Sequence, residues 1–422
     1  MQNKKYLFHS GSFLLLLFIF FACKSSNKIS KLNIAPLYEI ENNELDLTYF
    51  VSHLNENSSE LNIGLNSNKL LYTKALLDSS VNYYSEFRIT YEVYQGLEDD
   101  VIIDSASVFK KITDRSYQNT SFKLPLIQGK SYWIKTIITD KVRKFNAYNL
   151  IYVNKFDYNS AGYYINNIDT AILSQNKNSY WVNQDTTFLR HKILKNKLLF
   201  ALPIVVDYKI PNVPYDTKFF EKDVFQKTKH QVISLNENGA FNLPCTSTLV
   251  YLKTDSLNTQ GCLFLKVNTN YPRFTNINAL IKPLQYIMSK TEYENLLNSN
   301  NKRIAFEQFW IKEAGNKEQA RKAIKAYYTR VTEANKKFTT YKPGWLTDMG
   351  MIYIVKGTPE TVKRMNNREL WYYRDTNISD AEVFSFGLTN STIFKYHYTL
   401  ERLNDYKYSW EKQIKLCREG RL

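Results

Sequence analysis

Alternating apolar and polar residues predict strands over the first half of the chain. Residues 87–94 (FRITYEVY) and 131–138 (SYWIKTII) alternate with a period of two, which is typical of half-buried strands. Turn-forming residues such as Gln95-Gly96 lie between the segments. Further apolar strand segments are expected at 197–206, 249–252 and 263–267. Short strands without intervening helices favour antiparallel β-sandwiches.

We therefore predict two tandem β-sandwiches of the immunoglobulin-like or fibronectin-like kind, at residues 45–157 and 158–272. One long sandwich is the alternative interpretation of the same pattern.

Near residue 279 the period changes to steps of three and four. Apolar residues at these steps, from Ile324 to Phe338, predict an amphipathic helix over 317–338. Shorter helices are expected over 281–297 and 302–313. The predicted fold is therefore mainly β, with an α+β part at residues 273–422.

A small β-rich module is expected to follow these helices. Strands are predicted over 351–355, 370–373, 383–386 and 393–398, and a final helix near 410–417. Thr358-Pro359-Glu360 has the residue types of a helix or turn start.

The N-terminus has the order of features found in a signal peptide. Lys4 and Lys5 precede an unbroken apolar run at 13–22, which is too short to span a membrane. The run ends in Ala22-Cys23, which resembles a bacterial lipobox. We expect a signal peptide at 1–22, then lipidation of Cys23 and a polar tether over 23–44; a short buried helix is the alternative.

The composition narrows the classes of function. The chain has 422 residues, 44% of them hydrophobic, which excludes wholesale disorder. Its formal net charge of +16 could attract nucleic acid, an anionic membrane or an acidic polymer. Export makes nucleic acid an unsuitable partner, so we expect none.

The cysteines leave one question open. Cys245 and Cys262 lie on either side of a predicted hairpin, and an oxidising compartment would allow a disulfide between them. Two unpaired buried thiols are the alternative. No CxxC or HxxxH pair occurs, so no metal site or cofactor is predicted.

The most specific motif is Lys342-Pro343-Gly344-Trp345-Leu346-Thr347-Asp348-Met349-Gly350. It resembles the GWxTD domain of Bacteroidota lipoproteins, over roughly residues 280–400. One departure is Met349, where the family usually has Arg. The resemblance implies a Bacteroidota envelope lipoprotein and carries no catalytic activity.

Two interpretations of this motif remain open. In the first, Trp345, Asp348, Arg330 and Trp371 form a recognition site for a glycan or peptide. In the second, the motif is a structural turn that locks helix to sheet, with Gly344 and Gly350 permitting tight geometry and Thr347 bonding nearby amides.

A weaker pattern concerns modification. Bacteroidota O-glycosylate exported proteins at Asp followed by Ser or Thr and a small or apolar residue. This rule matches Ser105, Thr170, Thr186 and Ser256.

These observations predict a non-catalytic outer-membrane lipoprotein that acts as an interaction or scaffold component of an envelope complex for assembly, secretion or motility. The expected partners are an outer-membrane protein and a glycan or anionic lipid surface. No acidic residue follows Cys23 closely, which favours the periplasmic face of the outer membrane over the cell surface. The alternative is a glycan-binding or glycan-processing lipoprotein, for which Asp348 and Glu360 are the carboxylates nearest a motif.

Overall fold

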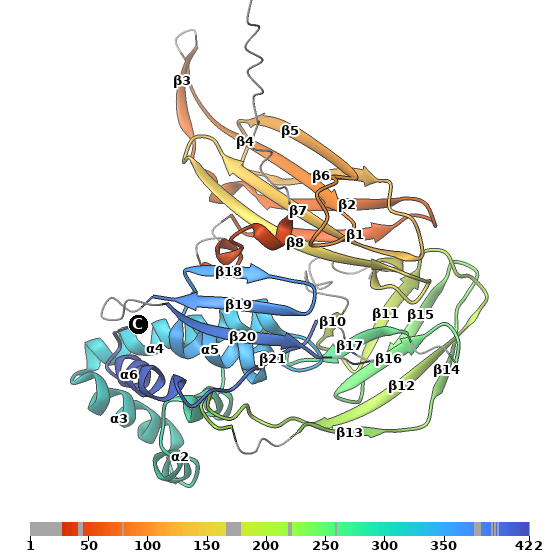
Figure 1. Ribbon diagram of the computed structural model, residues 1–422. Coiled ribbons are helices and arrows are strands. Elements are labelled where there is room, and N and C mark those ends of the chain that lie inside the picture. Colours follow the sequence, from red (N-terminus) through yellow and green to blue (C-terminus); the bar gives the residue numbers. More distant parts are fainter. Residues whose placement is uncertain are drawn as a thin grey trace, which may run out of the picture.

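The computed structural model describes residues 28–40, 45–77, 80–165, 179–217, 222–257, 260–374, 381–389, 391, 394 and 396–421. The predicted signal peptide, Cys23 and Thr170 lie outside these residues. The fold is mostly β with a helical segment towards the C-terminus, which confirms the predicted fold class (Figure 1). Among the described residues, none of the helices combines the length and apolar character that crossing a bilayer requires.

The first β unit consists of two sheets that pack face to face. One contains β1 (Leu47–His53), β2 (Ser59–Asn66) and β6 (Tyr117–Leu124). The other contains β3 (Thr73–Leu77), β4 (Ser80–Tyr94), β5 (Asp104–Ile112), β7 (Lys130–Asp140) and β8 (Phe145–Lys155). Apolar side chains from both sheets form one core, including Leu61 and Ile134, which are fully buried. A short 3₁₀ helix, η4 (Ser67–Lys69), follows β2.

The second β unit also has two layers. One sheet contains β9 (Tyr164–Ile165), β11 (Thr186–His191) and β15 (Ala240–Pro244). The other contains β10 (Ser179–Val182), β12 (Leu198–Asp207), β13 (Val224–Lys227), β14 (Gln231–Ser234), β16 (Leu249–Lys253) and β17 (Cys262–Lys266). The larger sheet is buried on both faces, because Tyr341 and Phe394 of the C-terminal part cover its outer side. The 3₁₀ helix η5 (Ala161–Tyr163) leads into this unit.

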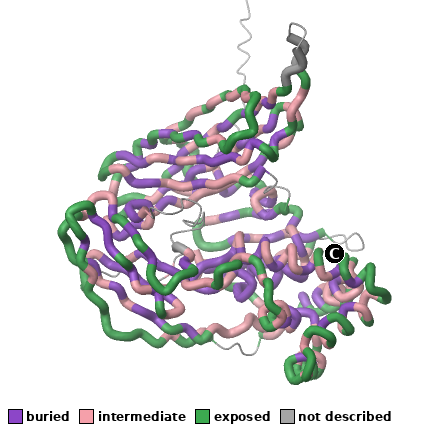
Figure 2. The backbone as a smooth tube through the Cα atoms, turned by 180° about the vertical axis from the view of Figure 1, so that it is seen from behind, coloured by how far each residue is buried: buried purple, intermediate pink, exposed green. Residues whose placement is uncertain are grey.

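The C-terminal part packs helices against a small antiparallel sheet. The sheet contains β18 (Thr361–Arg364), β19 (Arg368–Tyr373), β20 (Glu382–Leu388) and β21 (Tyr398–Leu400). The helices are α1 (Ile277–Ile281), α2 (Lys290–Leu297), α3 (Lys302–Ala314), α4 (Lys317–Phe338), α5 (Asp348–Lys356) and α6 (Tyr406–Arg418). A single apolar core joins helices and sheet, and Figure 2 shows the buried backbone concentrated there and between the β layers. The amphipathic pattern predicted a helix over 317–338, and α4 has these bounds.

The predicted helix over 281–297 is broken in the structure. Pro283 lies at the start of the 3₁₀ helix η6 (Lys282–Tyr286), and a new helix, α2, begins after Ser289. Ser289 and Glu292 form a reciprocal capping box, which fixes this second start.

The predicted strand at 351–355 is wrong, since these residues form the middle of α5. Thr347 supplies the N-cap, accepting a hydrogen bond from the Gly350 amide at 3.0 Å. The run is apolar throughout, and its residues from Met351 to Val355 are all fully buried. Periodicity cannot distinguish a buried helix from a buried strand in such a run.

The predicted helix or turn start at Thr358 is also corrected. The chain passes from Thr358 into strand β18, and the backbone amide of Glu360 bonds to the carbonyl of Tyr372 on β19 at 3.0 Å. Thr358 instead donates its hydroxyl to the carbonyl of Tyr38, at 3.3 Å.

Residues 28–40, which belong to the predicted polar tether, are part of the folded core. The 3₁₀ helices η1 (Ile29–Lys31) and η2 (Ala35–Tyr38) lie between β8 and β18, as the red coils in Figure 1 show. The Ile34 amide bonds to the Val362 carbonyl at 3.0 Å. Ala35 and Tyr38 are buried in the C-terminal core. This N-terminal strap (residues 28–40) therefore joins the two ends of the chain.

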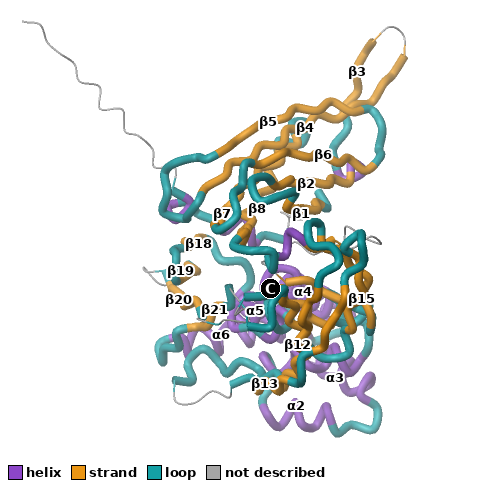
Figure 3. Tube along the Cα trace, turned by 90° about the vertical axis from the view of Figure 1, so that its right-hand side faces the viewer, coloured by secondary structure: helices purple, strands orange, loops and turns teal. Residues whose placement is uncertain are grey.

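The first β unit is stacked on the other two parts, and Figure 3 shows the C-terminal sheet and the second unit side by side beneath it. His53 of the first unit packs against Tyr163 of the second, with ring centroids 4.7 Å apart. On the other side, Trp133 of the first unit contacts Tyr396 of the C-terminal part at 5.8 Å.

Candidate functional site

The GWxTD motif connects α4 to α5 and folds back on the last turn of α4. The 3₁₀ helix η7 (Gly344–Leu346) begins the connection. The Gly344 amide donates to Thr339 Oγ1 at 3.0 Å, and the Trp345 amide donates to Asn335 Oδ1 at 3.0 Å. Side chains at the end of α4 therefore satisfy amides that the tight turn leaves without backbone partners.

Both motif glycines lie where a side chain cannot fit. A Cβ on Gly344 would lie 2.7 Å from the Ala334 carbonyl carbon and 2.8 Å from the Asn335 Cα, both in the backbone of α4. A Cβ on Gly350 would lie 2.8 Å from the carbonyl carbon of Gly344. Glycine thus allows α4, η7 and α5 to meet backbone to backbone.

Asp348 connects the start of α5 to two other segments. It forms an ion pair with Arg402 at 2.6 Å and accepts a hydrogen bond from the Leu400 amide of β21 at 2.8 Å. Arg402 also donates to the Asn212 carbonyl in the β12–β13 connection, at 3.1 Å. Both side chains of the ion pair are 9% exposed. The carboxylate also lies at the N-terminal end of α5, where the helix dipole attracts a negative charge.

Trp345 belongs to the core. It is 5% exposed and packs edge-on against Phe274 and Tyr286, with ring centroids 6.0 and 6.3 Å away. The Tyr286 hydroxyl donates to the Trp345 carbonyl at 2.6 Å. The indole ring therefore fixes η7 on the helices.

Arg330 and Trp371 are separated from Asp348 in the structure. Arg330 donates to the Val355 carbonyl at 3.1 Å, at the C-terminal end of α5, whereas Asp348 begins that helix. Val355 lies seven positions after Asp348 along the helix, which corresponds to about 10 Å. Trp371 is fully buried on β19. These residues therefore stabilise contacts in different places. The structure does not bring the predicted recognition residues together at one surface.

Sequence patterns missed a buried polar network around the N-terminal strap. Glu369 accepts hydrogen bonds from the Tyr38 hydroxyl at 2.5 Å and from the Trp371 indole at 2.8 Å, and it pairs with Arg364 at 2.5 Å. Burial acts to raise the pKa of Glu369, but Arg364 and these hydrogen bonds outweigh it and hold that pKa below its ordinary value. Tyr38 and Glu369 are 331 positions apart, and no local motif signals such a contact.

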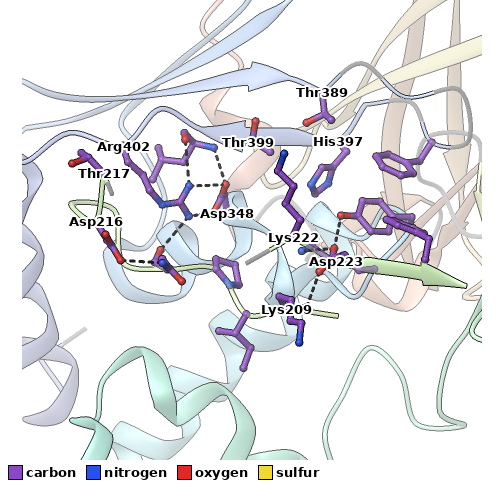
Figure 4. Close-up of a pocket in the computed structure, with 18 residues that line it drawn as sticks. Lys209, Asp216, Thr217, Lys222, Asp223, Asp348, Thr389, His397, Thr399 and Arg402 are labelled. Atoms are coloured by element: carbon purple, nitrogen blue, oxygen red, sulfur yellow. Dashed lines mark hydrogen bonds and ion pairs between the residues drawn. The ribbon is translucent and has the colours of Figure 1, made fainter. Parts of the chain in front are cut away.

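A cavity of about 640 Å³ lies between the β12–β13 connection and the C-terminal part. Figure 4 shows Asp216, Thr217 and the Asp348–Arg402 pair along one side, with Lys222, Asp223 and His397 facing them. Nothing in the sequence marked the β12–β13 connection, so the cavity was not predicted. Of the motif residues that were predicted, Asp348 lines it.

The buried charges of the cavity wall are paired. Lys342 lies 2.9 Å from Asp223, and their side chains are 10% and 4% exposed. Asp223 also accepts hydrogen bonds from the Tyr341 hydroxyl at 2.5 Å and from the Lys209 amide at 2.6 Å. Because Asp223 and Lys342 belong to different parts, this pair holds the joint closed.

His397 is neutral near pH 7. Its burial and the neighbouring Lys342 lower its pKa to about 4. Its Nδ1 lies 3.1 Å from the Thr340 hydroxyl, and its ring packs edge-on against Tyr341 at 4.8 Å. Phe394 stacks on Tyr341 at 3.9 Å and extends this aromatic wall.

Among the described residues, the groups considered for metal binding and for glycan hydrolysis lie apart from one another. None of the His, Cys, Asp and Glu side chains in the described ranges form a group of three that could hold a metal ion. Of the two carboxylates considered for glycan hydrolysis, Asp348 begins α5 and Glu360 lies beyond its C-terminal end. Asp348 is committed to Arg402, and Glu360 is exposed beside Arg374 at 3.7 Å.

The structure of the second unit decides between a Cys245–Cys262 disulfide and two unpaired thiols. Cys245 follows β15 and Cys262 begins β17, so they belong to opposite sheets, and both are free buried thiols. The proposed disulfide is therefore absent. Among the predicted glycosylation positions, the side chains of Ser105, Thr186 and Ser256 are exposed.

Comparisons with known proteins agree with the class that these features define, a β-rich protein with an α+β C-terminal domain. That domain is a GWxTD domain, found at residues 248–419. The match begins at β16, so it takes in two strands of the second β unit. No curated protein matches the chain.

Among solved structures, a β-glucuronidase of Bacteroides uniformis matches with 12% identity over 27% of this chain and 14% of its own, at a TM-score of 0.18. A red sea bream transglutaminase matches with 6% identity over 53% of this chain and 31% of its own, at a TM-score of 0.19. The chain thus spans less than a third of either enzyme's length. At such low TM-scores, nothing is carried over from either enzyme.

Proposed function

We propose that this protein is a non-catalytic lipoprotein of the outer membrane of a Bacteroidota bacterium. In this proposal Cys23 carries the lipid, and the protein acts as an interaction or scaffold component of an envelope complex. The GWxTD domain and the signal-peptide pattern at 1–22 support it. The commitment of the motif residues to packing also favours a structural role over a catalytic one.

The observation that carries the proposal is the N-terminal strap. Four residues separate Cys23 from Lys28, the first of the described residues, and this length of chain spans at most about 18 Å. A lipid on Cys23 would therefore hold the folded body against the membrane. Such close tethering suits a component that builds onto membrane proteins.

The charge and the residues after Cys23 support the proposed location. The signal peptide removes only two of the lysines, so the mature protein stays strongly basic and would be attracted to anionic headgroups. Residues 24–28 are Lys-Ser-Ser-Asn-Lys, without an acid. We propose the periplasmic face of the outer membrane on this basis.

The test is affinity purification of the full-length protein from detergent-solubilised outer membranes. We expect defined outer-membrane proteins to co-purify, and a Cys23→Ala variant to leave the membrane fraction and lose them. Recovery of the lipoprotein alone would refute the scaffold role. Protease treatment of intact cells tests the face, because digestion there would place the protein on the cell surface.

A second function is supported by the cavity. Its volume of about 640 Å³ falls within the range of small-ligand sites, and it lies at a joint between two parts, where such sites commonly occur. The second proposed function is therefore ligand binding in this cavity, and the ligand class is a glycan, as in the alternative predicted from the sequence.

A further inference from the structure

We propose that the cavity between the β12–β13 connection and the GWxTD domain binds a short acidic oligosaccharide, with a sugar carboxylate placed against Lys222. This inference rests on the second proposed function, glycan binding, and is independent of the scaffold role.

The charged residues that line the cavity favour a ligand with an acidic group. The charged lining residues are Lys209, Lys222, Lys342, Arg402, Asp216, Asp223 and Asp348. Lys342 and Arg402 are neutralised by Asp223 and Asp348, and Lys209 lies 3.0 Å from Asp207. Lys222 is exposed and pairs with none of the described residues. A sugar carboxylate can therefore pair with Lys222, for which the described lining supplies no ion-pair partner.

Hydroxyl groups and rings suit a sugar. Thr389 lines the cavity, and its buried hydroxyl has no hydrogen-bond partner among the described residues. Thr217 and Thr399 add two exposed hydroxyls. Phe225 and Phe394 are half-buried and supply apolar surface for the C–H face of a sugar ring. A site of this kind supplies polar partners together with apolar contact.

The edge of β21 argues against an extended peptide in the same cavity. A peptide that added a strand to this sheet would need the outward amide of Leu400. That amide already donates to Asp348 at 2.8 Å. Polar side chains of the lining, such as those of Thr217 and Thr399, can recognise sugar hydroxyls without a strand register.

The test is isothermal titration calorimetry of the full-length protein in detergent with trigalacturonate, and with maltotriose as the neutral control. We expect trigalacturonate to bind, maltotriose to bind at least fivefold more weakly, and added salt to weaken the acidic ligand. Lys222→Gln should weaken trigalacturonate about fivefold, as expected for one exposed charge pair. Thr389→Val should weaken it by a similar factor through loss of one hydrogen bond. Lys229→Gln, an exposed lysine outside the cavity, is the matched control and should bind as the wild type does.

The outcomes separate the site from the function. Binding by the wild type that neither Lys222→Gln nor Thr389→Val weakens would overturn the site and leave glycan binding standing. No binding of either oligosaccharide would overturn the site and glycan binding together. Lys222-dependent binding of a tripeptide carboxylate, stronger than that of trigalacturonate, would overturn the ligand class. Melting temperatures measured for each variant show whether it is folded.

Discussion

Substituting Gly344 by alanine tests whether the GWxTD motif is a packing device. The structure places the backbone of η7 against the last turns of α4, with no room for a Cβ on Gly344. The alanine variant adds one methyl group and changes no charge. Its effect therefore measures the closeness of the two backbones.

The expected cost follows from the distances. Ordinary contact for a Cβ begins near 3.4 Å, whereas the added atom would lie 2.7 Å from the Ala334 carbonyl carbon, so α4 or η7 must move. Overpacking of this kind costs about 1–3 kcal/mol. The movement also strains the Gly344 and Trp345 amide bonds to α4, which contribute about 1 kcal/mol each. We expect a loss of about 3 kcal/mol or more.

The assay is thermal unfolding followed by tryptophan fluorescence, since Trp310, Trp345, Trp371 and Trp410 are buried in the C-terminal core. For a domain of this size, about 3 kcal/mol lowers the midpoint by roughly 6–12 °C. Gly387→Ala is the matched control, because a Cβ there meets nothing within 4 Å. It should unfold with the wild type. A Gly344→Ala midpoint equal to that of Gly387→Ala would refute the close approach.

Three further results are expected. Tyr38→Phe should cost about 2 kcal/mol in urea unfolding, because Glu369 and Arg364 both lose a buried partner, whereas Tyr408→Phe, at a position 73% exposed, should cost nothing measurable. His53, His191 and His397 are buried, and their pKa values are about 3 to 4, whereas the unfolded side chain takes up a proton near pH 6.5. Lowering the pH from 7 to 5 should therefore destabilise the protein by about 2 kcal/mol per buried histidine. Equal unfolding midpoints at the two pH values would contradict this prediction. Thiol labelling at pH 7.5 should be slow until denaturant is added, because burial raises the pKa of each described cysteine; rapid labelling of the native protein would show that Cys245, Cys262 or Cys417 is accessible.

Local patterns were sufficient where one face of an element is buried and the other is solvated. The helix over 317–338 and the strands over 370–373 and 383–386 each have one apolar and one polar face, and the structure contains all three. They failed at 351–355, where every residue is buried and the signal of one-sided burial disappears. Thr347 is the N-cap of α5, whereas the sequence motif predicts it as part of a turn.

The candidate site was less predictable than the fold, because it depends on contacts between distant parts of the chain. The motif identified Asp348, but its partner Arg402 lies 54 positions away, and the opposite wall comes from the β12–β13 connection. The Lys342–Asp223 pair likewise joins two parts. Pairings of this kind depend on how the β units dock, which no periodicity encodes.

These contacts make the three parts a closed arrangement and not a string of modules. The first β unit meets the second through His53 and Tyr163, and it meets the C-terminal part through Trp133 and Tyr396. The second unit meets the C-terminal part through the Asp223–Lys342 pair. The N-terminal strap closes the arrangement, because the Ser30 amide bonds to Leu97 of the first unit while Tyr38 lies in the C-terminal core.

A closed arrangement has a mechanical consequence. A hinge at the cavity would have to break contacts at the other two joints, so the cavity walls are held at a fixed separation and a ligand meets a preformed site. Force applied through Cys23 would enter at the strap and reach the first unit and the GWxTD domain directly. In the proposed lipoprotein the GWxTD domain would bear the anchor through the strap, and it forms one wall of the cavity. The two crowded glycines fix the internal geometry of this domain and would thereby serve both roles.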